Sequence, residues 1–473
     1  MKLFGRGKRQ TRGLPNYWNE SVIERIQRDA GVDRETARTY FNEMLVFLDM
    51  VADSKKFISP PEAVDVAWHA FILHTRDYEH YCQERFGRVI HHQPTGAPDP
   101  DAYRRAYGQR ASAPGHMDNS VWVFPEAAAP RVEAGEAAEV AVAEPPALTE
   151  PWSLGGLRLS NRLVLAPLAG IGNWFVRLQA KRFGAGLVVS EMVSSFGLAY
   201  GNERTVREFL RIHPGEHPVS IQLFGHDTAI MRQAAAMVAD AGADLIDINM
   251  GCPVKKVCKT GAGAALLDDP ARAIGIAAAA REGGGLPVTV KLRPGRAPGD
   301  RAGVELARRL AEEAGVAGIG FHPRHASQQH SGGPDYALAR ELAGALEVPV
   351  MLSGGLSDEE SALSAYATSG AAALMLARGS FGNPWRFGRL LGTYEGEPAT
   401  AEIVAELEWV IAAAEDHLGR ERAGRYLRKF YPWYADTLGL TRRERQALVT
   451  APTTAAAREA LGALGTAEPA LAA

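Results

Sequence analysis

A thiol followed by several cationic side chains is the feature of this 473-residue chain best suited to chemistry. Cys252 lies in the run Asn249-Met-Gly-Cys-Pro, and Lys255, Lys256 and Lys259 follow it closely. A thiol with a pKa of about 8.5 is mostly protonated at neutral pH and can pass a proton to a bound substrate. The lysines would hold such a substrate if it is anionic. The alternative is a buried cysteine on an ordinary turn, with the lysines solvated outside it.

The segment before the thiol predicts where the thiol lies. Residues 244–249 form an apolar run with the length of a buried parallel strand. Gly251 and Pro253 then indicate a turn, and a flexible Gly261-Ala-Gly263 loop follows. Cys252 is therefore expected just beyond the carboxyl end of a strand. In α/β barrels these strand ends carry the catalytic groups.

Strand-like runs recur between residues 151 and 396, and amphipathic helical segments separate several of them. Eight repeats in about 230 residues are typical of a (β/α)8 TIM barrel. The competing fold is a doubly wound open sheet, which the missing G-x-G-x-x-G after the first strand disfavours. We therefore predict an α/β protein built on a barrel. The expected strands are residues 163–167, 187–191, 219–223, 244–249, 288–292, 318–322, 348–353 and 373–378.

Polar residues at the ends of these strands would meet at one mouth of the barrel. They lack the clustered carboxylates of a metal hydrolase or a glycosidase, and we predict no metal. The last two loops, Ser353-Gly-Gly and Arg378-Gly-Ser, are glycine-rich and stand where this fold usually grips phosphate. The sequence thus predicts a phosphorylated cofactor in the barrel, with Cys252 facing a second ligand. The mouth would carry Gln222, Asn249, Lys291, His322, Ser353 and Arg378.

Composition divides the chain into four parts. Residues 1–111 are mainly helical in pattern and rich in histidine, and residues 112–150 read as a linker of Ala, Pro and Glu. The barrel is expected over residues 151–396. Residues 397–473 are helical, basic and aromatic, and end in an Ala-rich tail.

Charge and cysteine content limit which partners and which cellular compartment can be expected for the protein. The net charge is −3, so an anionic partner must be met by a local basic patch. Three cysteines in so long a chain fit a reducing compartment. No apolar run reaches the roughly 20 residues that span a bilayer, and the basic N-terminus lacks the apolar stretch of a secretory signal. We expect a cytoplasmic protein without membrane contact.

Several motifs recur in a fixed order between residues 161 and 440. On these motifs the segment closely resembles the flavin-dependent tRNA-dihydrouridine synthases, which reduce the C5–C6 double bond of uridine in tRNA. The resemblance implies FMN as cofactor, NADPH or NADH as electron donor, and tRNA as partner. The motifs are Ala166-Pro-Leu-Ala-Gly170, Asn249-Met-Gly-Cys-Pro253, Val290-Lys-Leu-Arg293, His322-Pro-Arg324, Arg378-Gly-Ser-Phe-Gly-Asn-Pro-Trp385 and Leu427-Arg-Lys-Phe-Tyr-Pro-Trp-Tyr434.

The resemblance also implies residue roles. Cys252 would be the general acid that protonates C5 while a hydride from FMN N5 reaches C6, and Asn249 would orient the base. Lys255, Lys256, Lys259, Arg324, Arg428 and Lys429 would contact RNA. The positions that would bind FMN are Pro167, Leu168, Ala169, Gln222, Lys291, His322, Ser353, Gly354, Gly355, Ala377 and Arg378.

Some positions depart from the family pattern. The usual His-Gly-Arg-Thr-Arg is His322-Pro-Arg-His-Ala326 here, so the second arginine is lost, and a following tyrosine is His330. The first loop has Gly172-Asn173 in place of Thr-Asp. The changes after the sixth strand lie where RNA should pass, and they leave open which uridine is chosen and whether the substrate is tRNA.

The C-terminal segment allows two interpretations. Five basic residues between 420 and 429 recur at helical spacing beside aromatic side chains. A solvated helix that packs its aromatics on the barrel explains this pattern, and so does an RNA-binding surface. The helical domain that the resemblance implies favours RNA contact.

The N-terminal part resembles a helical module of plant glycine-rich-domain proteins and of bacterial proteins. His69 and His74 are five apart, which does not place two metal ligands on one helix face. His91, His92 and Cys82 could still join them in space. We favour a helical bundle without metal, in which Trp68, His69 and Tyr78 form a polar-edged core.

Two classes of function remain open at this stage. One is an FMN-dependent reductase acting on uridine in tRNA, or less consistently on another pyrimidine. The other is a catalytically inactive RNA-binding or scaffold protein built on an FMN barrel. Cys252, Lys291 and Arg378 favour the enzyme.

Overall fold

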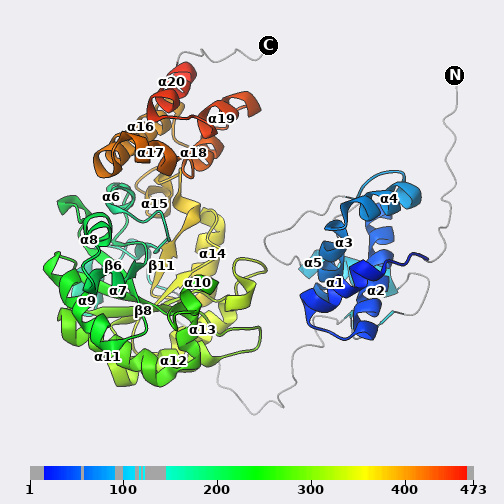
Figure 1. The fold of residues 1–473 in the computed structure, drawn as a ribbon, viewed down its shortest axis with the longest axis horizontal. Helices are drawn as coiled ribbons and strands as arrows, with labels where there is room; N and C mark the ends of the chain where they lie inside the picture. Colours follow the sequence, from blue (N-terminus) through cyan, green and yellow to red (C-terminus); the bar gives the residue numbers. More distant parts are fainter. Residues whose placement is uncertain are drawn as a thin grey trace. The chain divides into compact units, whose positions relative to one another are not determined.

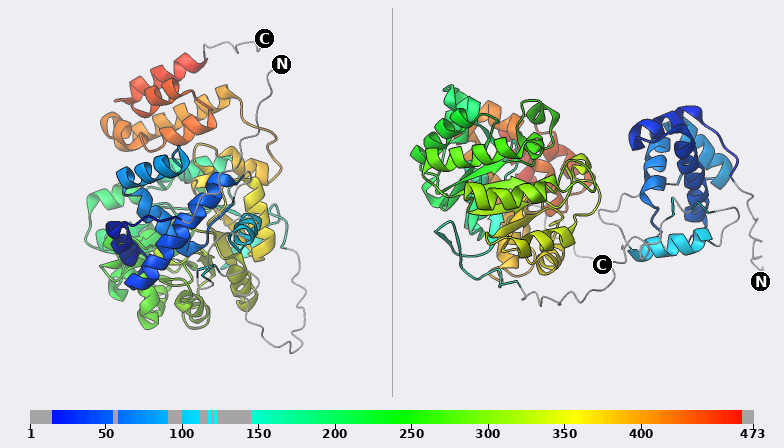
Figure 2. Two further views of the ribbon diagram at one scale, coloured as in Figure 1. Left: turned by 90° about the vertical axis from the view of Figure 1, so that its right-hand side faces the viewer. Right: turned by 90° about the horizontal axis from the view of Figure 1, so that it is seen from below.

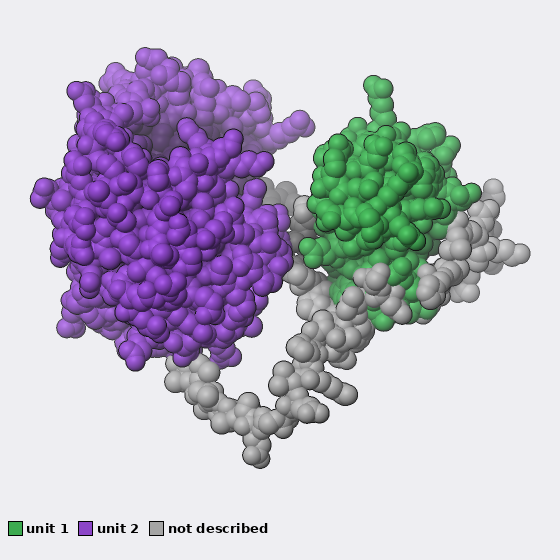
Figure 3. Space-filling model, turned by 60° about the horizontal axis from the view of Figure 1, so that its bottom comes forward, with its two compact units in different colours: residues 1–140 green, residues 141–473 purple. Residues whose placement is uncertain are grey.

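The computed structural model describes residues 15–54, 58–90, 100–111, 117–118, 121–122 and 145–465. The chain divides into two compact units, residues 1–140 and 141–473 (Figure 3). Most of the predicted linker and the basic N-terminal arm lie outside the described residues. Within the described segments, no helix is both long enough and apolar enough to cross a lipid bilayer.

The described part of the first unit consists of helices around an apolar core. Asn19 and Asp33 accept hydrogen bonds at two helix starts, and glycines with left-handed φ end two helices. Trp68 and Tyr78 are buried, and the indole N–H of Trp68 donates to Tyr78 Oη at 2.9 Å, as expected for a polar-edged core. His69, which was predicted to belong to the same core, is exposed instead. The helices are α1 (Glu20–Ala30), α2 (Arg34–Asp53), α3 (Glu62–Ile72), α4 (Thr75–Phe86) and α5 (Pro100–Ala111).

Two histidines of this unit, His69 and His74, bond to backbone carbonyls, and His80 Nε2 lies 3.4 Å from a Glu84 carboxylate oxygen. His69 Nδ1 lies 2.9 Å from Asp65 O, and His74 Nδ1 lies 3.0 Å from Ala70 O. In the part of the chain that the structure describes, no group of three His, Cys, Asp or Glu residues could hold a metal ion. His91 and His92 lie outside that part, so the absence of a metal stays a prediction.

The second unit begins with a short hairpin that the sequence pattern did not indicate. β1 (Trp152–Leu154) and β2 (Leu157–Leu159) pair antiparallel around Gly155-Gly156, whose φ angles are 59° and 87°. Two central residues with positive φ define the turn that suits a two-residue hairpin. Gly155 lies against Pro287 and Ala317, just before two barrel strands, so the hairpin covers the amino ends of the strands.

Eight parallel strands then close into a barrel (Figure 1). The chain of pairings runs from β4 through β3, β11, β10, β9, β8 and β7 to β6, and the β4–β6 pairing closes it. Each strand lies within a predicted run or overlaps it, and the predicted barrel is confirmed. The two-residue β5 (Val193–Ser194) pairs in parallel with the last two residues of β6. The barrel strands are β3 (Leu163–Leu165), β4 (Leu187–Val189), β6 (Val219–Phe224), β7 (Leu245–Asn249), β8 (Val288–Leu292), β9 (Gly318–Phe321), β10 (Val350–Ser353) and β11 (Ala373–Leu376).

Helices surround the strands, and their starts follow the sequence. Asp227 and Asp269 accept backbone hydrogen bonds at the beginnings of two of them, and Pro270 occupies the first turn of the second. The helices are α6 (Trp174–Arg182), α7 (Ser195–Ala199), α8 (Glu203–Phe209), α9 (Thr228–Asp240), α10 (Lys255–Cys258), α11 (Pro270–Gly284), α12 (Ala302–Arg309), α13 (Tyr336–Ala345), α14 (Glu359–Ser369) and α15 (Trp385–Leu390).

Five further helices form the end of the second unit and gather at one end of the barrel (Figures 1 and 2). Gln179 on α6 donates to Glu406 at 2.9 Å and to Tyr434 Oη at 2.8 Å, and all three side chains are buried. The two parts therefore share one packed and hydrogen-bonded interface. The helices are α16 (Thr400–Leu418), α17 (Arg420–Leu427), α18 (Tyr431–Thr437), α19 (Arg442–Val449) and α20 (Thr454–Gly465).

The predicted end of the linker at residue 150 is too late. Leu148 is buried in the barrel core, and its carbonyl accepts a hydrogen bond from Arg162 N at 2.8 Å. The Pro146 carbonyl accepts one from Tyr366 Oη at 2.9 Å. Residues 145–150 thus belong to the second unit, because one buried leucine and two hydrogen bonds fix them to the barrel.

Candidate active site

Cys252 lies on the loop after β7, and its side chain is half-buried. Oδ1 of Asn249, the last residue of β7, accepts hydrogen bonds from the backbone N–H groups of Gly251 at 3.2 Å and Cys252 at 2.9 Å. The Cys252 carbonyl accepts one from Ala264 N at 3.0 Å. Gly263 has φ 63°, and a Cβ there would lie 2.8 Å from Cys252 O. Glycine is therefore needed for the loop to close this tightly.

The surroundings of the thiol keep it protonated at neutral pH. Burial raises the pKa of Cys252 above its usual value, whereas the charges of Arg293 and Lys291 act in the opposite direction. The same cations would stabilise the sulfur once it has lost its proton. A thiol in this setting suits a proton donor better than a nucleophile that must be ionised beforehand.

Cys258 lies between Lys256 and Lys259 in the chain, which predicts a side chain beyond the turn, among the lysines. The structure differs from that prediction. Instead its Sγ donates to the Cys252 carbonyl at 3.3 Å, because the single turn of α10 folds back beneath the thiol loop. The lysines do point outward, and all three are exposed: Lys255, Lys256 and Lys259.

Three buried polar side chains lie behind Asn249 inside the barrel. Asn249 Nδ2 donates to Gln222 Oε1 at 2.9 Å, and Gln222 Nε2 donates to Asp247 Oδ2 at 2.6 Å. The Thr289 hydroxyl donates to Asp247 Oδ1 at 2.6 Å. Burial raises the pKa of Asp247 to about 6, although both hydrogen bonds and Lys291 favour its charged form. Asn249 therefore connects these buried side chains to the thiol loop, in addition to its predicted contact with the base.

Lys291 lies beside the thiol loop on the neighbouring strand, in register with Asn249. Its Nζ donates to Ser353 Oγ at 2.9 Å across the barrel mouth. Burial, assisted by the nearby charge of Arg293, lowers the pKa of Lys291 to about 8. Because an ammonium group carries three donors, two hydrogens stay available for a ligand in the cavity.

Two buried arginines stand beside Lys291 without a carboxylate partner among the described residues. Arg293 donates to the carbonyls of Arg324, His325 and Gln329 at 2.9–3.1 Å. Arg324 Nε donates to Gly332 O at 3.0 Å. These bonds hold the loop after β9, while the positive charges of both guanidinium groups stay uncompensated.

The position of Arg324 does not fit its predicted contact with RNA. Its side chain is buried, with 6% exposed, and one terminal nitrogen lies 3.3 Å from His322 Nε2. The same group lies 3.3 Å from the place where a Cβ on Gly354 would stand. Arg324 therefore faces the cavity beside the last glycine loops, because the Gly332 carbonyl draws its guanidinium inward.

Burial and the neighbouring cations Lys291, Arg293 and Arg324 hold the pKa of His322 far below its usual value. The imidazole is therefore neutral at physiological pH. A neutral ring can accept one hydrogen bond and donate another, which suits contact with a polar heterocycle or a hydroxyl group.

The glycine loops after β10 and β11 have the shape that a phosphate site requires. Gly354 and Gly355 have φ angles of 97° and 80°, and a Cβ on Gly354 would lie 2.4 Å from the His322 ring. Side chains are thus excluded here, and the backbone can approach a ligand closely. The Gly354 carbonyl is turned away and accepts from Tyr336 Oη at 3.0 Å.

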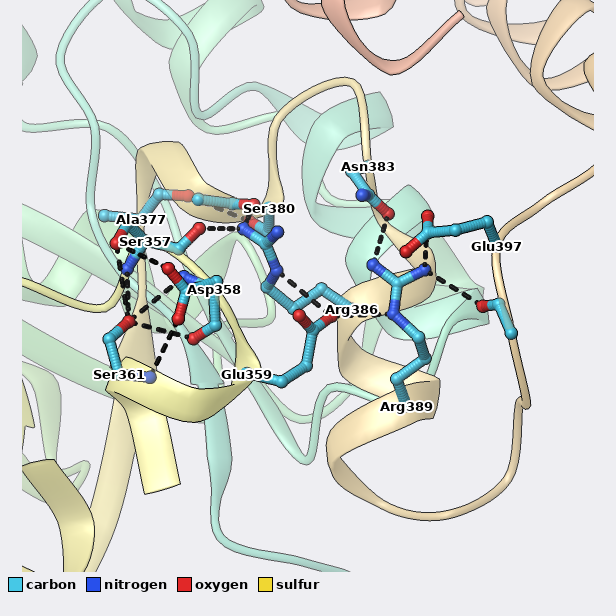
Figure 4. A network of polar contacts seen from close by, with 12 residues as sticks. Ser357, Asp358, Glu359, Ser361, Ala377, Ser380, Asn383, Arg386, Arg389 and Glu397 are labelled. Carbon is cyan, nitrogen blue, oxygen red and sulfur yellow. Dashed lines mark hydrogen bonds and ion pairs between the residues drawn. The ribbon is translucent and has the colours of Figure 1, made fainter. Parts of the chain in front are cut away.

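A network of polar contacts joins the two loops (Figure 4). Arg386 donates to the carbonyls of Ser357 and Gly379, one from each loop. Its Nε also bonds Glu359 at 3.3 Å, and Arg389 bonds the same carboxylate at 2.7 Å. Because α15 ties both loops together, their backbone N–H groups keep fixed relative positions.

Arg378 lies outside this network and is exposed. It lines a cavity of about 410 Å³ together with Phe381 and Trp433. Its charge also reaches Arg324 and His330, so its guanidinium lies on the side of the barrel mouth. Ala377 is half-buried beside it.

The charge balance of the mouth fits a phosphorylated cofactor. Lys291, Arg293 and Arg324 converge there, and Asp247 is the carboxylate that acts on Lys291. Buried cations in excess are costly unless an anion joins them. The glycine loops would take a phosphate group, and Lys291 would take an electron-rich ring.

The sequence pattern of the Dihydrouridine synthase (Dus) family matches residues 164–464. The chain belongs to this family. The tRNA-dihydrouridine synthase B of Pseudomonas aeruginosa is 39% identical over 292 residues, which cover 60% of this chain and 87% of that protein. A probable tRNA-dihydrouridine synthase of Rhodobacter capsulatus is 37% identical over 310 residues, or 63% of this chain and 94% of the relative.

Two further comparisons concern the barrel and the first unit. An old yellow enzyme homologue from Zymomonas mobilis aligns with 55% of this chain and 96% of its own at 17% identity and a TM-score of 0.42. Residues 13–109 match a different family, described as UCP032817-like. The predicted likeness of this module to glycine-rich-domain proteins stays a prediction.

In this member of the Dus family the C-terminal helices contact the loop after β3, which holds Pro167, Leu168 and Ala169. Lys429 donates to the Gly170 carbonyl and stands 4.0 Å from the centre of the Tyr426 ring. Asn173 Nδ2 donates to Tyr426 Oη at 2.5 Å. Both aromatic packing and cation placement are therefore present, and the two interpretations of this segment do not exclude each other.

A cavity of about 310 Å³ lies where these helices meet the barrel. Its wall contains the basic residues Arg204, Arg422, Arg425 and Lys429. Glu208 bonds two of them, Arg204 and Arg422. Arg428 is exposed nearby on the chain.

Sequence reasoning missed two carboxylates of the site. Asp247 is two residues before Asn249 on one strand, so both side chains face the same side, which was a usable signal. Glu191 accepts from Gly170 N at 2.6 Å, and burial raises its pKa.

Proposed function

We propose that this protein is a tRNA-dihydrouridine synthase that uses FMN to reduce the C5–C6 double bond of uridine in tRNA. The observation that carries the proposal is the pairing of a half-buried, protonated thiol after β7 with a half-buried lysine on β8 that can still donate to a ligand. Membership of the Dus family and the names of the curated relatives support the same reaction.

Different residues of the barrel mouth would contact different parts of the cofactor. The glycine loops at Ser353–Gly355 and Ala377–Arg378 would hold the phosphate, with Arg324 nearby. Lys291, His322 and Gln222 would contact the polar edge of the ring. When bound, FMN supplies the hydride that adds to C6, and NADPH is the proposed reductant that restores it.

Cys252 completes the reaction with a proton. Hydride addition at C6 leaves a negative charge on C5 and its neighbouring carbonyl, and the Sγ–H proton passes to C5. The balance is one hydride and one proton added across one double bond. Lys291 and Arg293 then stabilise the thiolate, which regains its proton from solvent. General acids of this kind contribute about 10²- to 10⁴-fold in rate.

Exposed cations offer contacts for the RNA backbone. Lys255, Lys256 and Lys259 are exposed just after the thiol loop, and Arg428 and Lys429 are exposed in the C-terminal helical part. The target uridine must leave its stack to reach the cavity. Such phosphate contacts predict binding that weakens steeply with salt.

Loss of the gene should remove dihydrouridine from specific tRNA positions. The measurement is mass-spectrometric mapping of tRNA from the deletion strain and from a strain complemented with the Cys252→Ala protein. We expect the modification to be missing from both, and restored by the wild-type gene. If every dihydrouridine persists, the protein acts on another pyrimidine or serves as a scaffold.

The second unit should work without the first. A chain that starts at Pro145 keeps Pro146 and Leu148 in their contacts with the barrel, whereas one that starts at Pro151 loses them. We expect residues 145–473 to bind FMN and reduce uridine, and the chain from 151 to have a lower melting temperature. Loss of the basic arm Lys2–Arg12, which lies outside the described residues, should weaken tRNA binding only.

This independence can fail in a recognisable way. The truncated protein would bind FMN and accept electrons from NADPH, yet leave tRNA unreduced at saturating concentration. That result would mean that the first unit presents the RNA to the barrel.

A further inference from the structure

Three neighbouring strands place a line of buried polar side chains behind the thiol loop. Gln222 on β6 is in register with Asp247 on β7, and Asp247 is in register with Thr289 on β8. The exposed fractions are 1%, 2% and 2% in that order. Buried polar groups are retained at a cost in free energy, so a fully bonded line of this kind calls for a reason.

The carboxylate of Asp247 sets the direction of every hydrogen bond in the line. An ionised carboxylate only accepts, so the group of Gln222 that faces it at 2.6 Å must be the NH₂. The Gln222 oxygen then faces Asn249, and the group of Asn249 that meets it at 2.9 Å must also be an NH₂. The Asn249 oxygen is left to face the thiol loop.

That oxygen is the part that reaches Cys252. It accepts the backbone N–H groups of both Gly251 and Cys252. If either amide turned over, an NH₂ group would face these two donors, and the loop would have to move away. The orientation of two side-chain amides therefore decides where the peptide that carries Cys252 lies.

We propose that Asp247 is a positioning residue for the proton-donating thiol, acting through Gln222 and Asn249. This inference rests on the proposed role of Cys252 in dihydrouridine synthesis. Asp247 does not touch the substrate; it fixes the thiol loop at the height where Sγ faces C5. A displacement of about 1 Å at a reacting group can cost about 10²-fold in rate.

A different role for Asp247 would be to balance the charge of Lys291, on which it also acts. The two roles predict different losses. Charge balance acts on cofactor binding and on its reduction by NADPH, whereas positioning acts on the proton step and on access to the thiol. The sign of the change in thiol reactivity separates them. Asp247 favours the charged form of Lys291, and that charge lowers the pKa of Cys252, so lost charge balance would slow alkylation of the thiol, whereas a displaced loop would speed it.

The test compares Asp247→Asn with the double variant Asp247→Asn/Gln222→Glu in the full-length protein. An asparagine at position 247 can either donate to Gln222 or accept from it. The single change therefore lets the side-chain amides of both Gln222 and Asn249 turn over. The double change keeps the charge and moves the carboxylate from position 247 to position 222, where it accepts from the new amide on one side and from Asn249 on the other. Ser220→Ala is the matched control. Ser220 lies on β6, the strand of Gln222, and its buried hydroxyl has no hydrogen-bond partner among the described residues.

Two measurements are made on each protein. One is the single-turnover rate at which tRNA oxidises the NADPH-reduced enzyme. The other is the rate of Cys252 alkylation by iodoacetamide, followed by mass spectrometry. For Asp247→Asn we expect the first to fall by about 100-fold and the second to rise by about tenfold as the loop opens. The double variant should recover both rates to within about threefold, and the control should match the wild type.

The results also separate this inference from the proposed function. Unchanged alkylation in Asp247→Asn would overturn the positioning role whether or not tRNA is the substrate. A double variant that binds FMN but stays as impaired as the single one would overturn it too. If wild-type enzyme fails to react with tRNA while alkylation follows the expected order, the proposed function fails and the positioning of the thiol stands. Should Asp247→Asn not fold, Gln222→Met breaks the same line at its middle and is judged by alkylation.

Discussion

Replacing Cys252 by alanine is expected to slow the reduction of uridine by about 10²- to 10⁴-fold and to leave the earlier half of the reaction intact. The thiol is the group on the loop after β7 that can hold and release a proton near neutral pH. Alanine removes the proton and adds no bulk, so the cavity keeps its shape. The measurement is stopped-flow absorbance of the flavin, first with NADPH and then with tRNA.

The second cysteine provides the matched control. Cys258→Ser keeps a donor for the Cys252 carbonyl, which Cys258 Sγ meets at 3.3 Å, and should react with tRNA at close to the wild-type rate. Cys258→Ala lacks the donor and should be affected mildly, because the Ala264 N–H still bonds that carbonyl. Equal losses in Cys252→Ala and Cys258→Ser would show that the acid has been misplaced.

The barrel was predictable because its strands are separate, largely apolar runs, most of which turn polar at or near the last residue or two. All eight were found at the right places, since burial on both faces leaves few polar residues inside a run. The hairpin of β1 and β2 escaped because its strands are three residues long, too short for periodicity. Its one local signal was the Gly155-Gly156 turn, which does not indicate that the hairpin covers one end of the barrel.

The site was predictable where motifs mark strand ends and less so where loops fold back. Lys291 and Ser353 were predicted as separate cofactor ligands, and the structure joins them by a hydrogen bond. Arg324 was assigned to RNA on the family resemblance alone, yet the Gly332 carbonyl, eight residues on, turns it inward. Contacts of this kind depend on loop closure, which no short motif encodes.

The polar line behind the thiol shows what strand register adds. Each of Gln222, Asp247 and Thr289 stands alone in its own run, and nothing in the sequence aligns the three. Only the pairing of β6 with β7 and of β7 with β8 makes them neighbours. From the sequence, Gln222 was predicted to contact the cofactor and Asn249 the base. The strand register adds hydrogen-bond partners inside the protein, because Gln222 bonds both Asp247 and Asn249.

Neutralising Lys291 is expected to have the largest effect on the cofactor. Lys291→Gln keeps a donor for Ser353 Oγ and removes the charge, so FMN affinity should fall by about 10- to 100-fold, the usual worth of a hydrogen bond to a charged group. The measurement is fluorescence titration of the apoprotein with FMN. Lys181→Gln is the control, because Lys181 is another lysine whose pKa burial lowers to about 8, and it bonds the Gly186 carbonyl just before the amino end of β4, away from the mouth.

The same lysine makes FMN binding depend on pH, and the sign follows from its pKa of about 8 in the free protein. Below that pH Lys291 is charged and ready for an anionic ligand; above it the protein must take up a proton when the ligand binds. FMN affinity should therefore be constant from about pH 6.5 to 7.5 and fall by up to about tenfold per pH unit above 8. Lys291→Gln should lose this dependence, whereas Lys181→Gln should keep it. An affinity that falls equally in all three proteins would assign the titration to another group and remove Lys291 from the cofactor site.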